Sequence, residues 1–237
     1  MPRVRLFIDR TLSGGETVTL EKDQSHYLLN VMRMDEGDSL EVFDGRTGAY
    51  PAVLEEARRK GAVLEVGPRD RPLRTPPDLW LLFAPIKKTR TDFIVEKAAE
   101  LGARRILPVR TELTNSERVR ADRLQAHAVE AAEQCGGTFV PEVGEMEPLG
   151  RLLDGWTDGR ALVFCDEMLT GPAEGWDAVP PGPAAILIGP EGGFSAAERA
   201  RIAGIGCPVS LGPRILRADT AAVAALTLWQ DRFGDWR

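Results

Sequence analysis

The chain has 237 residues, of which 43% are hydrophobic and 28% charged, and these values fit a soluble globular protein of one large or two modest domains. Its apolar runs are shorter than the roughly 18 residues that a membrane span needs, and charged side chains appear early, so we expect neither a transmembrane helix nor a secretory signal. The net charge of −6 argues against a nucleic-acid partner, but residues 87–123 carry ten Lys or Arg against six Asp or Glu, which leaves a basic region for phosphates.

Residues 1–70 are predicted to be rich in strands. Runs of β-branched and aromatic residues between turn signals predict strands at Arg3–Ile8, Ser39–Phe43, Tyr50–Glu55 and Ala62–Val66. Asp44-Gly45 predicts a turn or hairpin. One helix is expected at Ser25–Met34, where His26, Asn30 and Arg33 fall on one face. Residues 67–77 contain four prolines and predict an extended, semi-rigid linker.

After this linker, buried strands alternate with helices. Strands are predicted at Leu79–Ala84, Arg105–Val109, Ala161–Cys165, Ala184–Ile188 and Pro208–Leu211. Helices are predicted at Thr91–Leu101, Glu117–Cys135, Ser195–Ile205 and Asp219–Phe233. Ser195 and Glu198 have the spacing of a capping box. This alternation predicts a mostly parallel sheet covered by helices on both faces.

Two similar loops near the C-terminus are the most informative feature of the chain. Each follows a short apolar strand, begins with Gly-Pro and leads into a helix; the loops start at Gly189 and Gly212. Glycine lets a ligand approach the backbone closely, and two such loops side by side would form a pocket walled mainly by main chain, suited to a purine. The second loop also carries Arg214, Arg217 and Asp219 at the end of a strand, where α/β sheets place their ligands.

The motifs in these loops resemble those of a known family. Ile188-Gly-Pro-Glu-Gly-Gly-Phe-Ser195 and Leu211-Gly-Pro-Arg-Ile-Leu-Arg-Ala-Asp-Thr-Ala221 are similar to the two signature loops of the bacterial small-subunit (16S) rRNA uridine-N3 methyltransferases, of the SPOUT superfamily. Four further segments agree in order and spacing, so that the resemblance extends nearly end to end: His26–Met34, Gly37–Gly45, Glu96–Gly102 and Glu130–Gly136.

The resemblance implies an α/β protein of two domains. Residues 1–73 would form a small PUA-like β-barrel that helps bind RNA, and residues 74–237 a SPOUT domain with a parallel sheet and a deep trefoil knot. S-adenosylmethionine would bind in the knotted loops. The family acts as a homodimer whose active site is completed across the interface, so 16S rRNA of the small ribosomal subunit and a second copy of the chain are the expected partners.

The chain departs from the family pattern at two positions. Where the family usually has Leu-Arg-Thr-Glu-Thr-Ala, this chain has Asp219, whose side chain is one methylene shorter than Glu. After Glu-Gln-Cys-Gly the family often carries Arg, whereas Gly137 stands here and removes one potential RNA contact.

Methylation of uridine N3 requires loss of the N3 proton and stabilisation of the charge that spreads onto O2 and O4. Arg217 suits the second task because a guanidinium is a planar set of donors that stays protonated. Asp219 could accept the proton or orient Arg217, and Thr220 could contribute a hydroxyl. Asp219 and Thr220 could also simply cap the N-terminus of the last helix, and both roles can coexist.

The remaining site residues are expected to bind the cofactor or RNA. The predicted cofactor contacts are Ile188, Gly189, Pro190, Glu191, Gly192, Leu211, Gly212, Ile215 and Leu216. The predicted RNA contacts are His26, Asn30, Arg33, Lys87, Lys88 and Arg90. No metal is expected, because the two histidines are far apart and the sulfonium of the cofactor already activates the methyl group.

Three widely spaced cysteines, Cys135, Cys165 and Cys207, are typical of reduced thiols in a cytoplasmic protein. Two alternative functions remain open on the sequence. One is a different SPOUT enzyme that methylates a ribose 2′-oxygen, and the other is a non-catalytic RNA-binding ribosome-assembly factor, for which the shortened Asp219 is the argument.

Overall fold

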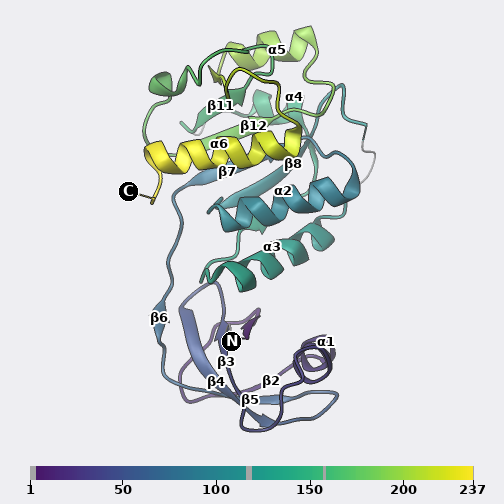
Figure 1. Ribbon diagram of the computed structural model, residues 1–237, viewed down its shortest axis with the longest axis vertical. Helices are drawn as coiled ribbons and strands as arrows, with labels where there is room; N and C mark the ends of the chain where they lie inside the picture. The colour runs from purple at the N-terminus through teal and green to yellow at the C-terminus, as the bar shows by residue number, and fades with distance from the viewer. Residues whose placement is uncertain (1–3, 116–118, 157–158, 237) are drawn as a thin grey trace. The chain divides into compact units, whose positions relative to one another are not determined.

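The computed structural model describes residues 4–115, 119–156 and 159–236 and divides into two compact units (Figure 1). Unit 1 comprises Met1–Thr75 and Ala132–Val140, and unit 2 comprises Pro76–Ala131 and Pro141–Arg237. The division in the chain falls close to the expected boundary at residue 73. Residues 132–140, however, belong to unit 1, whereas the expected division into residues 1–73 and 74–237 would place them in the second domain.

Unit 1 is built on a mixed six-stranded sheet. Its strands are β1 (Arg5–Phe7), β2 (Thr17–Thr19), β3 (Ser39–Phe43), β4 (Gly48–Glu56), β5 (Val63–Val66) and β6 (Arg71–Pro72). They follow the order β1-β3-β4-β5-β2, with β6 paired to β4, and only β1 and β3 run parallel. The four strands expected from the sequence are present, although Arg3 lies outside the described residues. The sequence did not reveal β2, which is only three residues long.

The segment predicted to be a linker is tied to this sheet. The N–H groups of Gly67, Asp70 and Leu73 donate to carbonyls in or beside β4, at 2.8, 3.0 and 3.1 Å. The prolines of this segment remove some donors, but the residues between them keep theirs and form β6. Residues 67–73 are thus part of the sheet of unit 1 and not only an extended, semi-rigid linker.

The predicted helix at Ser25–Met34 also differs in the structure. An α-helical segment, α1 (Lys22–His26), runs directly into a π-helical turn, η1 (Tyr27–Val31), which ends where the N–H of Met32 donates to the carbonyl of Tyr27. Arg33 follows in the left-handed conformation, with φ of 56°. A π turn is wider than an α turn, so the α spacing used to place three residues on one face does not hold beyond Asn30.

Within unit 1, residues 132–140 contact both Arg5 and the core: Arg5 binds the end of helix α3 (Ala121–Cys135), and Ala132 packs with Phe43 and Ala49. The Arg5 guanidinium donates to the carbonyls of Ala132, Glu133 and Gly137 at 2.7, 2.9 and 2.5 Å. The last carbonyls of a helix lack partners within the helix, and a cation there also complements the helix dipole.

Unit 2 contains a seven-stranded sheet in which every pair is parallel. Its order is β10-β8-β7-β12-β11-β13, with β9 paired to β8. The strands are β7 (Leu79–Phe83), β8 (Arg105–Arg110), β9 (Glu142–Val143), β10 (Glu147–Pro148), β11 (Ala161–Cys165), β12 (Ala184–Ile188) and β13 (Cys207–Val209). The helices are α2 (Lys88–Glu100), α3 (Ala121–Cys135), α4 (Leu149–Asp154), η2 (Trp176–Ala178), α5 (Ala196–Ala203) and α6 (Ala218–Phe233); the last four residues of α3 belong to unit 1. Four of the five strands expected in this part of the chain are confirmed. The fifth, expected at Pro208–Leu211, is shifted to Cys207–Val209, so that Ser210 and Leu211 lie beyond the end of β13.

Helices cover both faces of the parallel sheet, as the alternation predicts. Leu81 and Phe83 of β7 point to one face and pack with α2, α3 and α6, whereas Leu82 points to the other and packs with α4 and α5. Figure 1 shows α6 lying beside α2. The helix expected at Glu117–Cys135 corresponds to α3, but Glu117 lies outside the described residues. The sequence did not predict α4, β9 or β10. This arrangement leaves the loops after β11, β12 and β13 at one edge of the sheet.

Candidate active site at the carboxyl ends of three strands

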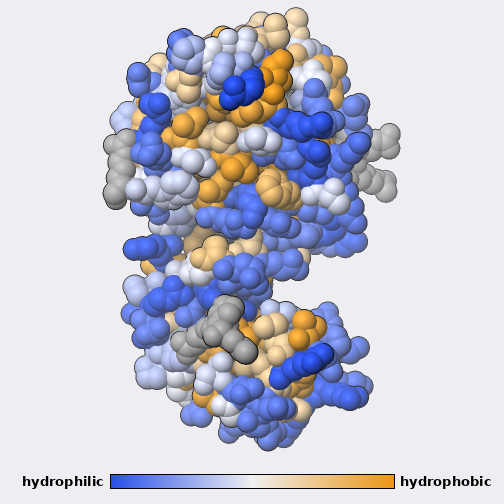
Figure 2. Space-filling model, in the orientation of Figure 1, coloured by the Kyte–Doolittle hydropathy of each residue, from blue (hydrophilic) through white to orange (hydrophobic). Residues whose placement is uncertain are grey.

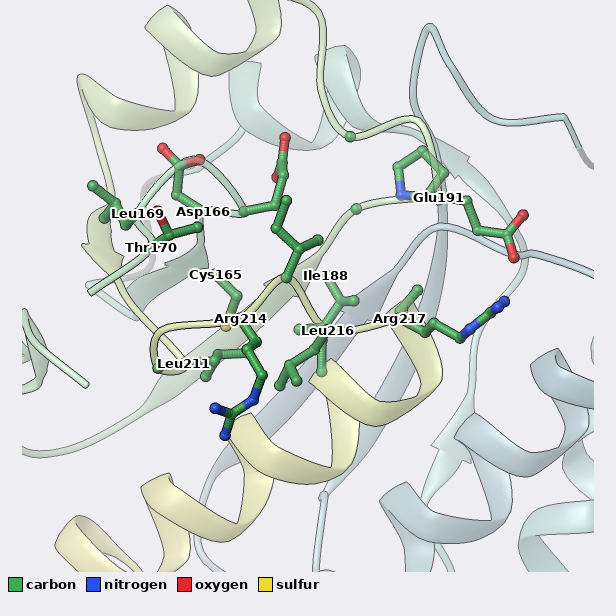
Figure 3. Close-up of a pocket in the computed structure, with 18 residues that line it drawn as sticks. Cys165, Asp166, Leu169, Thr170, Ile188, Glu191, Leu211, Arg214, Leu216 and Arg217 are labelled. Carbon is green, nitrogen blue, oxygen red and sulfur yellow. The ribbon is translucent and has the colours of Figure 1, made fainter. Parts of the chain in front are cut away.

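A cavity of about 280 Å³ lies where three neighbouring strands of unit 2 end (Figure 3). Strand β12 ends at Ile188, β11 at Cys165 and β13 at Val209. Because these strands are parallel, the loops that follow them leave the sheet at the same edge, which is where α/β proteins place ligands. The cavity is therefore built from three loops.

The loop after β12 forms the first wall. A Cβ on Gly189 would lie 2.7 Å from the buried Phe194 ring, so glycine is required for this close approach. Gly193 has a φ of +69° and donates its N–H to the carbonyl of Pro190 at 2.9 Å, which closes a tight turn. The wall thus consists largely of backbone, as the Gly-Pro pattern suggests.

The loop after β13 forms the second wall. Gly212, with a φ of +117°, has open space around the position that a Cβ would take. Its N–H donates to Ser210 Oγ at 3.1 Å, and that hydroxyl in turn donates to the carbonyl of Leu169 at 2.9 Å. Ile215 leaves 72% of its surface exposed at the rim. The second wall is therefore bonded to the loop that carries Leu169.

Eight of the nine predicted cofactor contacts line this cavity: Ile188, Gly189, Pro190, Glu191, Leu211, Gly212, Ile215 and Leu216. Gly192 is the exception, and Gly193 lines the cavity in its place. A Cβ on Gly192 would lie 3.6 Å from Leu113, because the turn directs Gly192 toward the loop after β8.

The third wall was missed by the sequence reasoning. It is the loop after β11, and its lining residues are Cys165, Asp166, Glu167, Leu169 and Thr170. Arg199 of α5 binds the carboxylates of both Asp166 and Glu167. Burial raises the pKa of the Cys165 thiol far above its usual value, so this thiol stays protonated. The signal was present, since two acidic residues directly follow a buried strand.

Arg217 lines the cavity and Arg214 does so from another direction. In Figure 3 the side chains of Arg217 and Glu191 extend toward the same side of the cavity, whereas Arg214 points away from them. Arg217, which the sequence suggests as the group that stabilises negative charge, is thus an exposed residue at the cavity.

Asp219 has a different environment from the expected one. Its Oδ2 accepts a hydrogen bond from Arg90 Nη1 of α2 at 2.8 Å, and its Oδ1 accepts from the backbone N–H of Thr220 at 2.9 Å. The N-cap of α6 is Arg217, so the suggestion that Asp219 and Thr220 cap this helix is wrong; both lie within its first turn. Neither residue lines the cavity, and the Thr220 side chain is exposed.

The predicted RNA contacts lie on exposed surface, with one exception. His26, Asn30 and Arg33 of unit 1 are exposed, and Asn30 Nδ2 lies 3.0 Å from His26 Nδ1. Lys87 and Lys88, at the start of α2, are exposed as well. Arg90 is half-buried, with 35% of its side chain exposed, and it forms the ion pair with Asp219.

No helix among the described residues is long and apolar enough to cross a bilayer. No group of three or more His, Cys, Asp and Glu side chains within the same ranges is placed to hold a metal ion.

Known proteins share both the sequence and the fold of this chain. Residues 74–230 match the model of the RNA methyltransferase domain, and residues 20–67 match that of the RNA methyltransferase PUA domain. Ribosomal RNA small subunit methyltransferase E of Buchnera aphidicola is 28% identical over 98% of this chain and 97% of its own length. The protein of the same name from Synechocystis is 33% identical over 89% of this chain and 71% of its own length.

A solved structure agrees with these relatives. Ribosomal RNA small subunit methyltransferase E from Neisseria gonorrhoeae, bound to S-adenosyl methionine, is 29% identical, covers 99% of this chain and 100% of its own, and superposes with a TM-score of 0.88. The domain match spans more than half of the chain and includes all three loops of the cavity. The chain therefore belongs to the RNA methyltransferase family that includes ribosomal RNA small subunit methyltransferase E.

Proposed function

We propose that this protein transfers a methyl group from S-adenosylmethionine to N3 of a uridine in 16S rRNA of the small ribosomal subunit, in the cytoplasm. The observation that carries the proposal is the cavity at the ends of β11, β12 and β13, which gathers the predicted loop residues beside Arg217. The family membership supports the reaction class, and the N. gonorrhoeae relative is bound to the same cofactor.

The cavity suits S-adenosylmethionine in shape and chemistry. Ile188, Leu211 and Leu216 supply apolar surface for a purine, and the open space at Gly212 lets a ligand reach the backbone. Asp166 and Glu167 place carboxylates on the third wall, where they would favour a cationic ligand. The volume of about 280 Å³ is close to the lower end of the range for small-molecule sites, roughly 300 Å³.

When bound, S-adenosylmethionine supplies a methyl group on a positively charged sulfur, which becomes a neutral thioether as N3 is methylated. Arg217 would donate hydrogen bonds to the uracil oxygens on which negative charge develops as the N3 proton leaves. Asp219 follows Arg217 by two residues and is held by Arg90. It would accept the N3 proton or orient Arg217. Thr220 would contribute its exposed hydroxyl nearby.

RNA would contact both units. We assign RNA binding to His26, Asn30 and Arg33 of unit 1 and to Lys87 and Lys88 of unit 2, because exposed cations and amides are the groups that bind phosphates and sugars. The match of residues 20–67 to a PUA domain supports this role for the first unit. The target base must be unpaired before N3 becomes reachable.

The finer features of the fold belong to the same proposal. Residues 1–73 would form a PUA-like barrel around the six-stranded sheet, and residues 74–237 a SPOUT domain whose last strands and helix thread a trefoil knot. The non-sequential order β12-β11-β13, followed by α6, supports a complex path of the chain around the cavity. The three cysteines, which form no disulfide, support a reducing compartment.

The experiment is transfer of labelled methyl from S-adenosylmethionine to small ribosomal subunits that lack the modification, followed by nucleoside analysis. The expected product is 3-methyluridine. A ribose-methylated nucleoside would instead support the 2′-O-methyltransferase alternative. Cofactor binding without transfer would support a non-catalytic assembly factor, and absence of cofactor binding in calorimetry would contradict the proposal.

Replacement of Arg217 tests the role of its guanidinium. Arg217→Ala is expected to lower kcat by about 100-fold or more, since removing one donor to a developing negative charge has an effect of this size. The affinity for S-adenosylmethionine should change little, because the other loop residues form most of the cavity wall. Arg151→Ala is the matched control: Arg151 is exposed on α4, lies outside the basic region of residues 87–123 and does not line the cavity. Equal losses of binding and turnover in Arg217→Ala would show a structural role instead.

A further inference from the structure

The ion pair between Arg90 and Asp219 joins two segments that are 129 residues apart in the chain. Arg90 stands in the first turn of α2, and Asp219 stands in the first turn of α6. The Asp219 side chain is 16% exposed and that of Arg90 35% exposed, so the contact is partly shielded from solvent. Such shielding makes a charge pair stronger than one on the open surface.

Both oxygens of the Asp219 carboxylate are engaged. Oδ2 binds Arg90 at 2.8 Å, and Oδ1 binds the Thr220 N–H at 2.9 Å. These two contacts hold the carboxylate in one orientation. The contact therefore favours an orienting role for Asp219 over the transfer of a proton.

Arg90 itself stands on a fixed support. The Thr91 hydroxyl, in a side chain that is 2% exposed, accepts the N–H of Ile86 at 3.0 Å and donates to the carbonyl of the same residue at 3.1 Å. Just before this loop, the N–H of Ala84 donates to the carbonyl of Ile188 at 3.0 Å. Ile188 is the last residue of β12 and lines the cavity.

The other partner of the pair, Asp219, lies directly after the second wall in the chain. Asp219 follows Arg217 by two residues, and Arg217 is both the N-cap of α6 and a lining residue of the cavity. Movement of Asp219 would therefore move the segment that presents the Arg217 guanidinium. The ion pair therefore links the strand end at Ile188, where the first wall begins, with the segment at Arg217, where the second wall ends.

We propose that Arg90 is a positioning residue: through Asp219 it holds the start of α6 in the place that aligns Arg217 for methyl transfer. This inference rests on the proposed function. It replaces the role of phosphate contact that the sequence suggests for Arg90.

The test compares Arg90→Met with Arg151→Met, a matched loss of an exposed arginine of α4 that lies outside the basic region of residues 87–123 and does not line the cavity. Arg90→Met is expected to lower kcat at least about 10-fold, while the KM for the small subunit and the Kd for S-adenosylmethionine stay within about threefold. Arg151→Met should keep wild-type values. Arg90→Lys, which retains the charge, should recover part of kcat.

A double-mutant cycle with Asp219→Asn gives the second readout. If Arg90 acts through Asp219, the double variant should be no slower than the slower single variant. A phosphate contact would instead raise the KM for RNA, weaken its salt dependence, leave kcat intact and add to the effect of Asp219→Asn. That outcome would overturn the inference.

Two controls separate this inference from other failures. Calorimetry with S-adenosylmethionine and thermal unfolding establish that each variant is folded and binds the cofactor. Wild-type protein without transfer activity would contradict the proposed function, whereas an active wild type with a normal kcat for Arg90→Met would contradict the positioning role alone.

Discussion

A single carboxylate, Asp44, organises the turn between β3 and β4 in unit 1. Its oxygens accept the N–H groups of Leu12, Arg46 and Thr47 at 2.9, 2.9 and 2.7 Å, and the Thr47 hydroxyl at 2.5 Å. Burial alone would raise the pKa of Asp44, but these donors outweigh it and lower the pKa to about 2. The sequence indicated a turn at Asp44-Gly45, and the structure shows that the carboxylate holds it together.

Replacement of this carboxylate should therefore cost stability in a pH-dependent way. A pKa lowered from 3.8 to about 2 corresponds to about 2 kcal/mol of stability, which is present above pH 4 and lost as the pH falls through about 2. Asp44→Asn should lower the free energy of unfolding by about that amount at pH 7 and flatten its fall between pH 4 and 2. Urea unfolding followed by circular dichroism at several pH values measures both effects.

The exposed Asp70 of the same unit provides the control for this experiment. Asp70→Asn should unfold like the wild type at each pH. An acid profile for Asp44→Asn that parallels the wild-type profile would show that Asp44 does not supply this pH dependence.

Among the secondary-structure elements, α5 begins with a capping box that directly follows the first wall of the cavity. Ser195 Oγ accepts the N–H of Glu198 at 3.2 Å, and Glu198 Oε2 accepts the N–H of Ser195 at 3.2 Å, which confirms the capping box expected from the sequence. The cap stands two residues after Gly193, where the first wall ends. It fixes the point at which the cavity loop becomes a helix.

Ser195→Ala removes the side-chain half of this cap. The free energy of unfolding should fall by about 1 kcal/mol, the usual effect of losing an N-cap hydroxyl. Denaturant unfolding of the variant measures the loss, and Ser39→Ala, at an exposed position of β3, serves as the control. An unchanged stability of Ser195→Ala would mean that the cavity loop is held by its other contacts alone.

Elements defined by periodicity were predicted well, and those defined by tertiary contacts were not. The strands β7, β8, β11 and β12 are buried apolar runs, and their pattern is visible in the sequence. The two-residue strands β6, β9 and β10 have no pattern of their own and exist because a neighbouring strand offers hydrogen-bonding groups. The π turn η1 is equally invisible, since no residue type marks it.

For the whole molecule, the outer surface of α6 is the feature that bears on assembly. Val223, Ala224, Thr227 and Leu228 are partly exposed and recur at the spacing of one helix face. Figure 2, which shows the same face of the molecule as Figure 1, displays apolar side chains over α6 with hydrophilic ones around them. Apolar surface of this kind is typical of protein interfaces, and we propose that it supports the homodimer expected from the family resemblance.

A charge placed in this surface should separate the copies. Val223→Asp is expected to convert a dimer to a monomer, because burying an unpaired carboxylate at an interface is strongly unfavourable. Sedimentation equilibrium measures the change. Ile205→Asp, at an exposed apolar position after α5, should leave the mass unchanged. A wild-type protein that sediments as a monomer would contradict the dimer.

Local residue order and spacing are enough to predict the strand–helix alternation, the two Gly-Pro loops and the family, because each of these depends on residues that are close together in the chain. Only the tertiary structure added the third wall at Asp166 and Glu167, moved residues 132–140 into unit 1 and paired Arg90 with Asp219. The physical reason is that strand order and helix packing decide which distant segments meet. No periodic pattern in the sequence can indicate an ion pair between residues that are 129 positions apart.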